Sequence, residues 1–464
     1  MDDLLTRSIS ELSPQLKSLK VSPVAVTEAC LARIAATEDR LHAYVRVFAG
    51  AARAAAGQAE AEISAGHWKG PLHGIPVAIK DLYDVAGVET TASSKVRAHW
   101  LRTSDSTAVA RLRAAGAIIL GKTQTHEFAY GVTTPTTRNP WDTRCVPGGS
   151  SGGSAATVAS GGAFAAIGTD TGGSIRIPGS LCGVVGLKPT FGRVSRVGIT
   201  SLSWGLDHAG PITRSVEDAA LCLQAMAGYD ADDPGSLDEP VPDLRAECAK
   251  GMAGLRVGIP RNYFFDRLRP PVAIAVRNGY QTLQALGATL VDVTIPMADQ
   301  FVPVETLILM AEASTYHRRM LRETPKLYTD EVRAQLEAGM LIPAVDYLHA
   351  QRVRTLLQRE VRELYRQIDV IVAPSVPAAA VPVETRSLRW DDGTEERVAS
   401  AYTRLAMFAD VLGLPTLTLP CGFTDGGLPI GMQIMGRPLD EATVVRASAL
   451  YEHATDWHKR HPQL

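Results

Sequence analysis

The sequence predicts an α/β fold in which helices cover a sheet. Residues 107–115 and 272–286 each carry a helical pattern that ends at a glycine, and each is followed at once by a short apolar run, at 117–120 and 290–293. A helix that leads directly into a strand is typical of a crossover connection onto a sheet. Further predicted strands, each stopped by a nearby proline, are residues 256–259, 370–373 and 416–419.

The N-terminal part of the chain is predicted to be helical. Residues 8–19 and 26–35 space their apolar side chains three and four positions apart, and Ser22 before a proline is a typical helix start. The alanine-rich residues 51–65 continue the pattern as an exposed helix. We therefore expect residues 1–66 to form peripheral helices outside the catalytic core.

The whole chain, residues 1–464, is predicted to be one domain, because no internal repeat and no long linker divides it. Residues 67–215 contain the glycine-rich motifs described below and are predicted to form the catalytic core. Residues 216–464 are expected to supply the remainder of the sheet and the substrate pocket. Residues 229–243, dense in Asp and Pro, are predicted to be a surface loop between the two halves.

The charge balance excludes some classes of partner. The 464 residues include 47 Lys and Arg against 49 Asp and Glu, a formal net charge of -2. Such a balance creates no overall field that draws the protein to nucleic acid or to an anionic membrane. We expect a small neutral substrate, with no direct nucleic-acid contact and no membrane contact. One sequence carries no signature of an interface, so a homodimer stays an open option.

The cysteines and the distribution of apolar residues indicate the cellular compartment of the protein. The six cysteines have no CxxC spacing, which argues against a disulfide framework or a zinc site and favours buried small apolar residues. The acidic N-terminus from Met1 to Leu5 lacks the features of a signal peptide, and no stretch reaches about 18 apolar residues without charge. We expect a cytoplasmic protein with no metal and no cofactor.

Two serine-bearing glycine loops follow an apolar run that ends in a lysine. The run is residues 76–80 (PVAIK), and the loops are residues 148–154 (GGSSGGS) and 168–174 (GTDTGGS). Glycine loops let backbone N–H groups converge on an oxyanion, two serines can offer a nucleophile and a proton shuttle, and a lysine can act as base. The pattern indicates an acyl-transfer enzyme that needs no histidine.

Lys80 and Ser150 each have a simpler interpretation. A lysine base requires a pKa depressed from its reference value near 10.4, and Lys80 ends an apolar run, as expected of a buried strand end; the alternative is a structural or exposed lysine. Ser150 could belong to a flexible linker. That alternative weakens because a small-residue helix predicted at 154–160 and a buried strand predicted at 163–167 follow directly.

Ser174 is the predicted nucleophile. It follows Thr171-Gly172-Gly173 and precedes Pro178, where a helix is expected to begin. Successive N–H groups before a helix form an anion-binding nest, which suits the oxyanion of acyl transfer. Asp170 and Arg176 flank this loop and are predicted to pair and hold it, without direct chemistry.

Competing motifs fit less well. Residues 149–153 match the GxSxG elbow of α/β-hydrolases, but the preceding residues make a poor strand. Residues 116–123 match the GxxxxGK[ST] phosphate loop, but their interior is an apolar strand. His73, His126 and His208 lack metal-ligand spacing and are predicted to be structural.

These motifs, in this order and spacing, resemble those of the amidase signature family. The resemblance is carried by the lysine run, both glycine loops, residues 168–178 (GTDTGGSIRIP) and residues 183–190 (GVVGLKPT), with family-like segments at 412–415 and 427–433. It covers nearly the whole chain. It implies a single-domain α/β/α sandwich with a mixed, mostly parallel sheet of about eleven strands.

The resemblance also implies roles for residues. Lys80 takes the position of the family's base, Ser150 that of its cis-serine and Ser174 that of its acyl-enzyme nucleophile. The implied oxyanion hole consists of the backbone N–H groups of Thr171, Gly172, Gly173 and Ser174, and the supporting residues are Ser151, Thr169, Asp170 and Arg176.

The function implied by the resemblance is hydrolysis of a small-molecule carboxamide, with release of ammonia or an amine. One alternative is the glutamine-hydrolysing subunit of an aminoacyl-tRNA amidotransferase. Those subunits carry paired arginines in an EVKRRI-like helix, where this chain has EVRAQL at 331–336 and Arg333 lies one or two positions early.

Two further alternatives are an allophanate or carboxybiuret hydrolase, loosely supported by residues 339–354, and a non-catalytic amidase scaffold, which the filled catalytic positions oppose. The predicted pocket-lining residues are Tyr130, Trp204 and Met310, for which core packing is an equal alternative.

Overall fold

The fold is built on one mixed sheet. A computed structural model describes residues 3–464, so Met1 and Asp2 of the acidic N-terminus lie outside the described residues. Eleven strands of these residues form a sheet in the order β1-β3-β2-β4-β6-β5-β12-β13-β9-β7-β8. The strands are β1 Tyr44–Val47, β2 Pro76–Lys80, β3 Ile118–Thr123, β4 Ala165–Asp170, β5 Val185–Lys188, β6 His208–Thr213, β7 Arg256–Pro260, β8 Thr289–Val293, β9 Val370–Pro374, β12 Thr416–Phe423 and β13 Pro429–Gly436, and a separate hairpin pairs β10 Ser387–Arg389 with β11 Glu395–Arg397.

The predicted α/β class and the eleven strands are confirmed, but the sheet is not mostly parallel. Of the ten neighbouring pairs in the described sheet, four are parallel, namely β2 with β3 and β4, and β7 with β8 and β9. The other six are antiparallel. One reason is that a short turn at residues 424–428 joins β12 to β13, and a connection this short permits only an antiparallel pair.

Helices enclose this sheet. Every residue of β2, β4 and β13 is buried, which requires cover on both faces. Helix α6 lies against β2 and β4, and α10 and α16 lie against β12 and β13. The helices are α1 Asp3–Thr6, α2 Ile9–Lys17, α3 Pro23–Leu41, α4 Ala49–Ser64, α5 Thr107–Ala114, α6 Gly152–Ser160, α7 Arg176–Cys182, α8 Val216–Met226, α9 Leu244–Glu247, α10 Pro270–Ala285, α11 Phe301–Glu323, α12 Asp330–Gly339, α13 Ala344–Leu364, α14 Val398–Arg404, α15 Met407–Leu412 and α16 Glu441–His453, with short 3-10 turns at Lys95–Arg97, Glu127–Ala129, Ala298–Gln300, Pro325–Leu327 and Trp457–Lys459.

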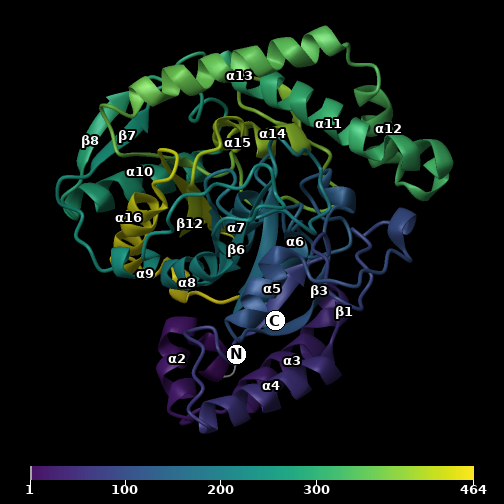
Figure 1. The fold of residues 1–464 in the computed structure, drawn as a ribbon. Coiled ribbons are helices and arrows are strands. Elements are labelled where there is room, and N and C mark those ends of the chain that lie inside the picture. The colour runs from purple at the N-terminus through teal and green to yellow at the C-terminus, as the bar shows by residue number, and fades with distance from the viewer. Residues whose placement is uncertain (1–2) are drawn as a thin grey trace.

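Figure 1 shows where two groups of helices, the N-terminal ones and those of residues 301–364, lie in the molecule. The purple helices α2, α3 and α4 lie together at the lower edge of the view, and the green helices α11, α12 and α13 lie along the upper edge. The predicted helix starts are correct: Ser8 caps α2, and the Ser22 hydroxyl accepts a hydrogen bond from the Val24 N–H at 3.0 Å.

The expectation that residues 1–66 form only peripheral helices is wrong in one respect. Residues 44–47 form β1, which pairs antiparallel with β3 at the end of the sheet. The sequence Tyr-Val-Arg-Val favours a strand because most of its residues are β-branched or aromatic, and a four-residue run between helices is easily overlooked. The boundaries proposed at residues 66 and 215 stay a prediction.

The structure also bears on the apparent phosphate loop, on the cysteines and on membrane-spanning helices. Residues 118–123 form β3, so the apparent phosphate loop is a buried strand as expected. All six cysteines are buried and unpaired, as predicted. Among the helices of residues 3–464, none combines the length and the apolar character needed to cross a membrane.

Candidate active site

Lys80 lies at the end of the buried strand β2, where the sequence predicted it. The strand runs between β3 and β4, and the Lys80 side chain is fully buried. Its Nζ lies 2.7 Å from Ser150 Oγ, 2.8 Å from Ser151 Oγ and 2.8 Å from Thr169 Oγ1. The two glycine loops therefore meet at the lysine, since Ser150 and Ser151 belong to the first loop and Thr169 to the second.

Burial controls the charge of Lys80. Removal from water lowers the pKa of the amine well below its ordinary value, although Asp170 and Asp207 favour the charged form. Burial thus favours the uncharged amine, which has two hydrogens and one lone pair for three hydroxyl neighbours. Ser151 directs its own proton to the Thr169 carbonyl oxygen at 3.2 Å, so it accepts from Lys80. Ser150 or Thr169 is left to donate to the lone pair.

Ser150 is held by the turn that precedes α6. The Gly149–Ser150 peptide bond is cis. The Ser150 carbonyl oxygen accepts from the His126 N–H and from the Thr134 hydroxyl, both at 3.1 Å. These contacts hold the Ser150 carbonyl group in place. The Ser150 side chain is fully buried and its hydroxyl contacts the Lys80 nitrogen.

The second loop joins β4 to α7 and surrounds a buried carboxylate. Asp170 accepts hydrogen bonds from the N–H groups of Gly173 at 2.7 Å, Ile175 at 3.0 Å and Arg176 at 3.3 Å. This corrects one prediction, because the Gly173 N–H is occupied by Asp170 and is unavailable to an oxyanion. Within residues 3–464, the N–H groups of Thr171, Gly172 and Ser174 make no hydrogen bond.

Arg176 supports this loop from beneath, as the sequence suggested. Its guanidinium forms two hydrogen bonds with Asp170, both at 3.0 Å, and one with Asp410 at 2.6 Å, and all three side chains are fully buried. Burial works against ionisation of Asp170, but pairing with Arg176 lowers its pKa below the ordinary range. Burial raises the pKa of Asp410 well above its ordinary value, and the neighbouring carboxyl group of Asp170 raises it further. Arg176, which both carboxyl groups share, opposes these effects.

Ser174 is brought beside the first loop. Its carbonyl oxygen accepts from the Ser151 N–H at 3.2 Å. Among the described residues, its hydroxyl makes no hydrogen bond, and in particular none joins it to the Ser150 hydroxyl. The Ser174 side chain instead lines a cavity.

This cavity has a volume of about 240 Å³ and is mostly apolar. Tyr130 and Met310 line it as predicted, and Gln335 reaches it from α12. The further lining residues are Ala129, Gly131, Val132, Gly172, Leu202, Val302, Glu305, Thr306, Leu309, Glu396, Ala399, Ser400, Thr403, Arg404 and Met407. A space of this size suits a small substrate.

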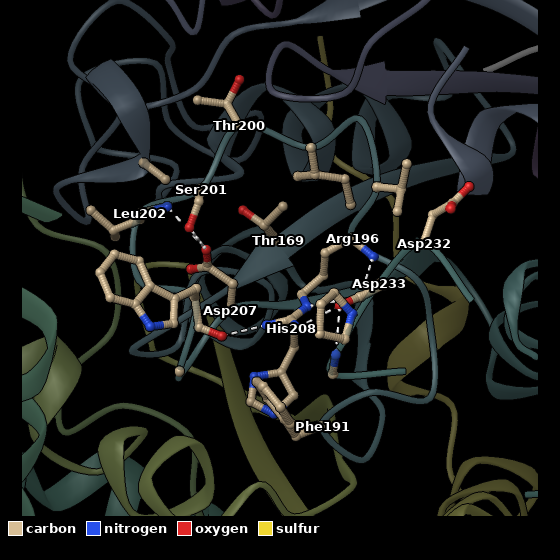
Figure 2. A pocket seen from close by; sticks show the side chains of 17 residues that line it. Thr169, Phe191, Arg196, Thr200, Ser201, Leu202, Asp207, His208, Asp232 and Asp233 are labelled. Atoms are coloured by element: carbon tan, nitrogen blue, oxygen red, sulfur yellow. Dashed lines mark hydrogen bonds and ion pairs between the residues drawn. The ribbon is translucent and has the colours of Figure 1, made fainter. Parts of the chain in front are cut away.

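Trp204 lines a different cavity, so its prediction for the Ser174 pocket is wrong. This second cavity, of about 600 Å³, also contains Thr169, Asp207 and His208 (Figure 2). Trp204 is 45% exposed there, because its loop turns outward. The two cavities share Ala129 and Leu202, and they therefore adjoin.

Two of the histidines singled out in the sequence, His73 and His208, contact neighbouring protein oxygens. His73 lies 3.0 Å from a Glu62 oxygen, and His208 Nδ1 lies 3.1 Å from the Asp170 carbonyl oxygen. Burial lowers the pKa of His73, His126 and His208. Over residues 3–464, no group of three or more His, Cys, Asp or Glu is arranged to hold a metal ion.

Sequence reasoning missed several acidic residues of the site. Asp207 accepts from the hydroxyls of Thr171 and Ser201, both at 2.7 Å, and so ties the second loop to the next segment. Figure 2 shows the contact with Ser201. Asp410 and Glu305 come from α15 and α11, which no motif links to the serines. A buried acid inside an apolar helix, as in the run MFADVL, is the signal that could have found Asp410.

Comparison with known proteins decides the family. A family model described as Amidase matches residues 25–445, which is most of the chain. The chain belongs to the amidase signature family. An amidase from Pseudomonas putida is 56% identical over 466 residues, covering 100% of the chain and 99% of that protein. A glutamyl-tRNA(Gln) amidotransferase subunit from Roseiflexus sp. (strain RS-1) is 41% identical over 485 residues, covering 98% of each.

A solved structure agrees with this assignment. A crystal structure described as an amidase superposes with a TM-score of 0.88 at 35% identity, covering 96% of the chain and 99% of the other. The chain is an amidase, an enzyme that hydrolyses amide C–N bonds.

Proposed function

We propose that this amidase hydrolyses a small-molecule carboxamide through an acyl-enzyme on Ser174 and releases ammonia or an amine. The observation that carries the proposal is the 2.7 Å contact between the buried amine of Lys80 and the Ser150 hydroxyl. A neutral amine held against a hydroxyl can take its proton, which an ordinary exposed lysine cannot do at neutral pH.

The acylation step uses both serines. Neutral Lys80 draws the proton of Ser150, Ser150 takes the proton of Ser174, and the Ser174 oxygen bonds to the amide carbon. Catalytic hydrogen bonds often form only when substrate is bound, so we infer that the Ser174 hydroxyl turns from the cavity toward Ser150 in the substrate complex. The N–H groups of Thr171, Gly172 and Ser174 are free to stabilise the carbonyl oxygen as it becomes negative.

Collapse of this intermediate breaks the C–N bond. The proton on Lys80 returns through Ser150 to the departing nitrogen, which leaves as ammonia or an amine. Water then attacks the ester on Ser174, with Lys80 and Ser150 accepting its proton, and the acid product leaves as the Ser174 hydroxyl is restored. Ser151, Thr169, Asp170 and Arg176 position these groups without exchanging protons with the substrate.

The amidotransferase alternative is disfavoured by the cavity that holds Ser174. Glutamine carries an α-carboxylate that needs a cation, yet Arg333 pairs with Asp330 at 3.0 Å and Glu337 at 3.7 Å on α12 and does not line the cavity. The residue of that helix that does reach the cavity is the neutral Gln335. We therefore infer that the substrate does not bind through a carboxylate group of its own.

The same argument weighs against an allophanate or carboxybiuret substrate, since both are anions. Arg404 lines the cavity, but it is engaged by Glu396 at 3.2 Å and by the carbonyl oxygen of Asp266 at 3.0 Å. A carboxylate in the cavity would find no unpaired cation among its lining residues.

The test is a measurement of ammonia release by the purified chain from aliphatic amides, aryl amides, ureas and glutamine, without any partner subunit. Turnover of simple amides that is lost in Ser174→Ala supports the proposal. Turnover that requires glutamine and an added partner would overturn it in favour of the amidotransferase alternative.

A further inference from the structure

Glu305 is a buried acid without a partner in the cavity that contains Ser174. It projects from α11 and is 1% exposed. Within residues 3–464, its carboxyl group makes no hydrogen bond and no ion pair, and its Oε1 is among the buried polar atoms without a partner. Buried polar groups are nearly always hydrogen-bonded, so a carboxyl group left unpaired beside the predicted nucleophile indicates a ligand.

Glu305 lies against the proposed oxyanion segment. A Cβ atom added at Gly172 would meet Glu305 Oε1 at 2.7 Å. Gly172 precedes Ser174 by two residues, so a substrate group that reaches Glu305 is separated from the scissile carbonyl by only a few bonds.

The surroundings of the Glu305 carboxyl group oppose its ionisation. Burial raises its pKa well above the ordinary value, the carboxyl groups of Asp410 and Asp170 raise it further, and Arg176 opposes them. Two further titratable neighbours are the hydroxyls of Tyr130 and Tyr263. Burial raises the pKa of each hydroxyl, and the Glu305 carboxyl group raises it further. On the cavity wall, Glu396 and Arg404 neutralise each other at 3.2 Å.

A second unpaired group completes the arrangement. The buried Tyr130 hydroxyl lines the same cavity and also lacks a hydrogen-bond partner among the described residues. A neutral carboxyl group offers one O–H donor and one carbonyl acceptor, and a phenol offers a donor and an acceptor. Glu305 and Tyr130 differ from the other polar side chains of this lining in being buried with polar atoms that lack a hydrogen-bond partner among the described residues.

We propose that Glu305 determines substrate specificity, by pairing as an uncharged acid with a second, uncharged amide-like group on the acyl part of the substrate. This inference rests on the proposed function and names its substrate class: amides whose acyl part carries a second carboxamide or ureido group. Such a group presents an N–H and a C=O side by side, which match the acceptor and donor of the carboxyl group.

Charged substrate groups fit this position less well. An anion would lie beside the Glu305 carboxyl group, while the Arg404 cation of the cavity wall already pairs with Glu396. A cation would require Glu305 to ionise, and burying two charges carries a large desolvation cost that their attraction has to offset. An apolar group would leave both the Glu305 and the Tyr130 polar atoms unpaired.

The experiment compares three amides of similar size: succinamide, the shape-matched 4-methylpentanamide and the cationic 4-aminobutanamide. For the unchanged enzyme, we expect kcat/KM for succinamide to exceed that for 4-methylpentanamide by about 10-fold or more, as expected for a site built to hydrogen-bond its substrate. In Glu305→Leu, this preference should fall by about 10- to 100-fold. Glu305→Gln, which keeps one donor and one acceptor, should retain it within about threefold.

A pH series separates this role from a structural one. The preference for succinamide should decline in the unchanged enzyme as rising pH ionises Glu305, and it should be independent of pH in Glu305→Gln. The matched control is Glu337→Gln, the same change at an exposed position of α12, which should leave the preference unaltered. If Glu305→Leu does not fold, the Glu305→Gln profile alone decides.

Three results would overturn the inference: no preference for succinamide in the unchanged enzyme, an unchanged preference in Glu305→Leu, or preferred turnover of 4-aminobutanamide that Glu305→Gln abolishes. The last would make Glu305 a cation-binding carboxylate. Failure of every amide to release ammonia is a different outcome, because it would reject the proposed function itself.

Discussion

The amine of Lys80 lies 2.7 Å from the hydroxyl of Ser150 in a part of the molecule that water does not reach. The cost of burying a charge lowers the pKa of the amine and favours its neutral form, which the proposed mechanism uses as a base. The three hydroxyls around it, from Ser150, Ser151 and Thr169, are its hydrogen-bond partners, and Asp170 and Asp207 act on its charge only from outside hydrogen-bond distance. The proposed mechanism follows from this contact.

Replacing Lys80 by methionine is expected to lower kcat/KM by about 10²–10⁴-fold, the usual contribution of a general base. Lys80→Arg should be equally inactive, because a guanidinium stays protonated. Ammonia release measures the effect, and circular dichroism checks the fold. Lys326→Met, at an exposed position, is the control and should retain activity. Full activity in Lys80→Met would remove the lysine from the mechanism.

The lowered pKa of Lys80 determines how kcat/KM should change with pH. Because burial lowers the pKa of Lys80 well below its ordinary value, the amine loses its proton well before pH 10.4, which extends the range of the neutral, active form toward neutral pH. We expect kcat/KM to be level near neutrality and to fall on the acid side as Lys80 gains a proton. A rate on a simple amide that rises only near pH 10 would contradict the neutral-amine assignment.

Gly173→Ala should damage the oxyanion segment. Gly173 has a φ of +109°, and an added Cβ would lie 2.6 Å from Ala406 Cβ and 2.7 Å from Ile177 Cδ1. The clash would displace the neighbouring backbone N–H groups of Gly172 and Ser174, and this displacement is expected to lower kcat by about 10²–10³-fold. Gly66→Ala is the control, since Gly66 has a φ of +83° with nothing within 4 Å. It should cost stability, read from thermal unfolding, and leave kcat intact.

Arg176→Met is expected to destabilise the fold strongly. It would leave the buried carboxyl groups of Asp170 and Asp410 without their cation, and breaking a buried ion pair in this way costs about 3–5 kcal/mol. Urea unfolding measures the change. Arg144→Met removes an exposed pair with Asp142 and should change stability by no more than about 1 kcal/mol. Equal effects of the two variants would show that the buried cluster is not structural.

The sequence predicted the parts of this site that depend on local pattern. The apolar run before Lys80 is enough to place the lysine at a buried strand end, and the glycines around Ser150 and Ser174 mark turns where side-chain bulk is excluded. The Asp170–Arg176 pair was predictable because the two residues lie six positions apart on one loop. The helix starts at Ser8 and Ser22 follow from hydroxyl capping, which is also local.

What the sequence did not predict depends on contacts between distant segments. Glu305 and Asp410 reach the site from helices that follow the second loop by more than a hundred residues. The sequence around each of them does not indicate which residues it will contact. The direction of each strand depends on how the intervening chain crosses the sheet, so the antiparallel pairs were missed. Strand β1 is too short to show a periodicity. The wrong assignment of Trp204 has the same origin, because a loop's sequence does not fix which way it turns.

The central claim is that Ser174 becomes covalently acylated, and trapping with a fluorophosphonate followed by mass spectrometry tests it most directly. We expect one adduct per chain, located on the peptide that contains Ser174, with loss of amidase activity in proportion to labelling. Ser174→Ala should take up none, and Lys80→Met should be labelled much more slowly. A label on Ser150 or elsewhere, or unimpaired turnover of the labelled enzyme, would contradict the account.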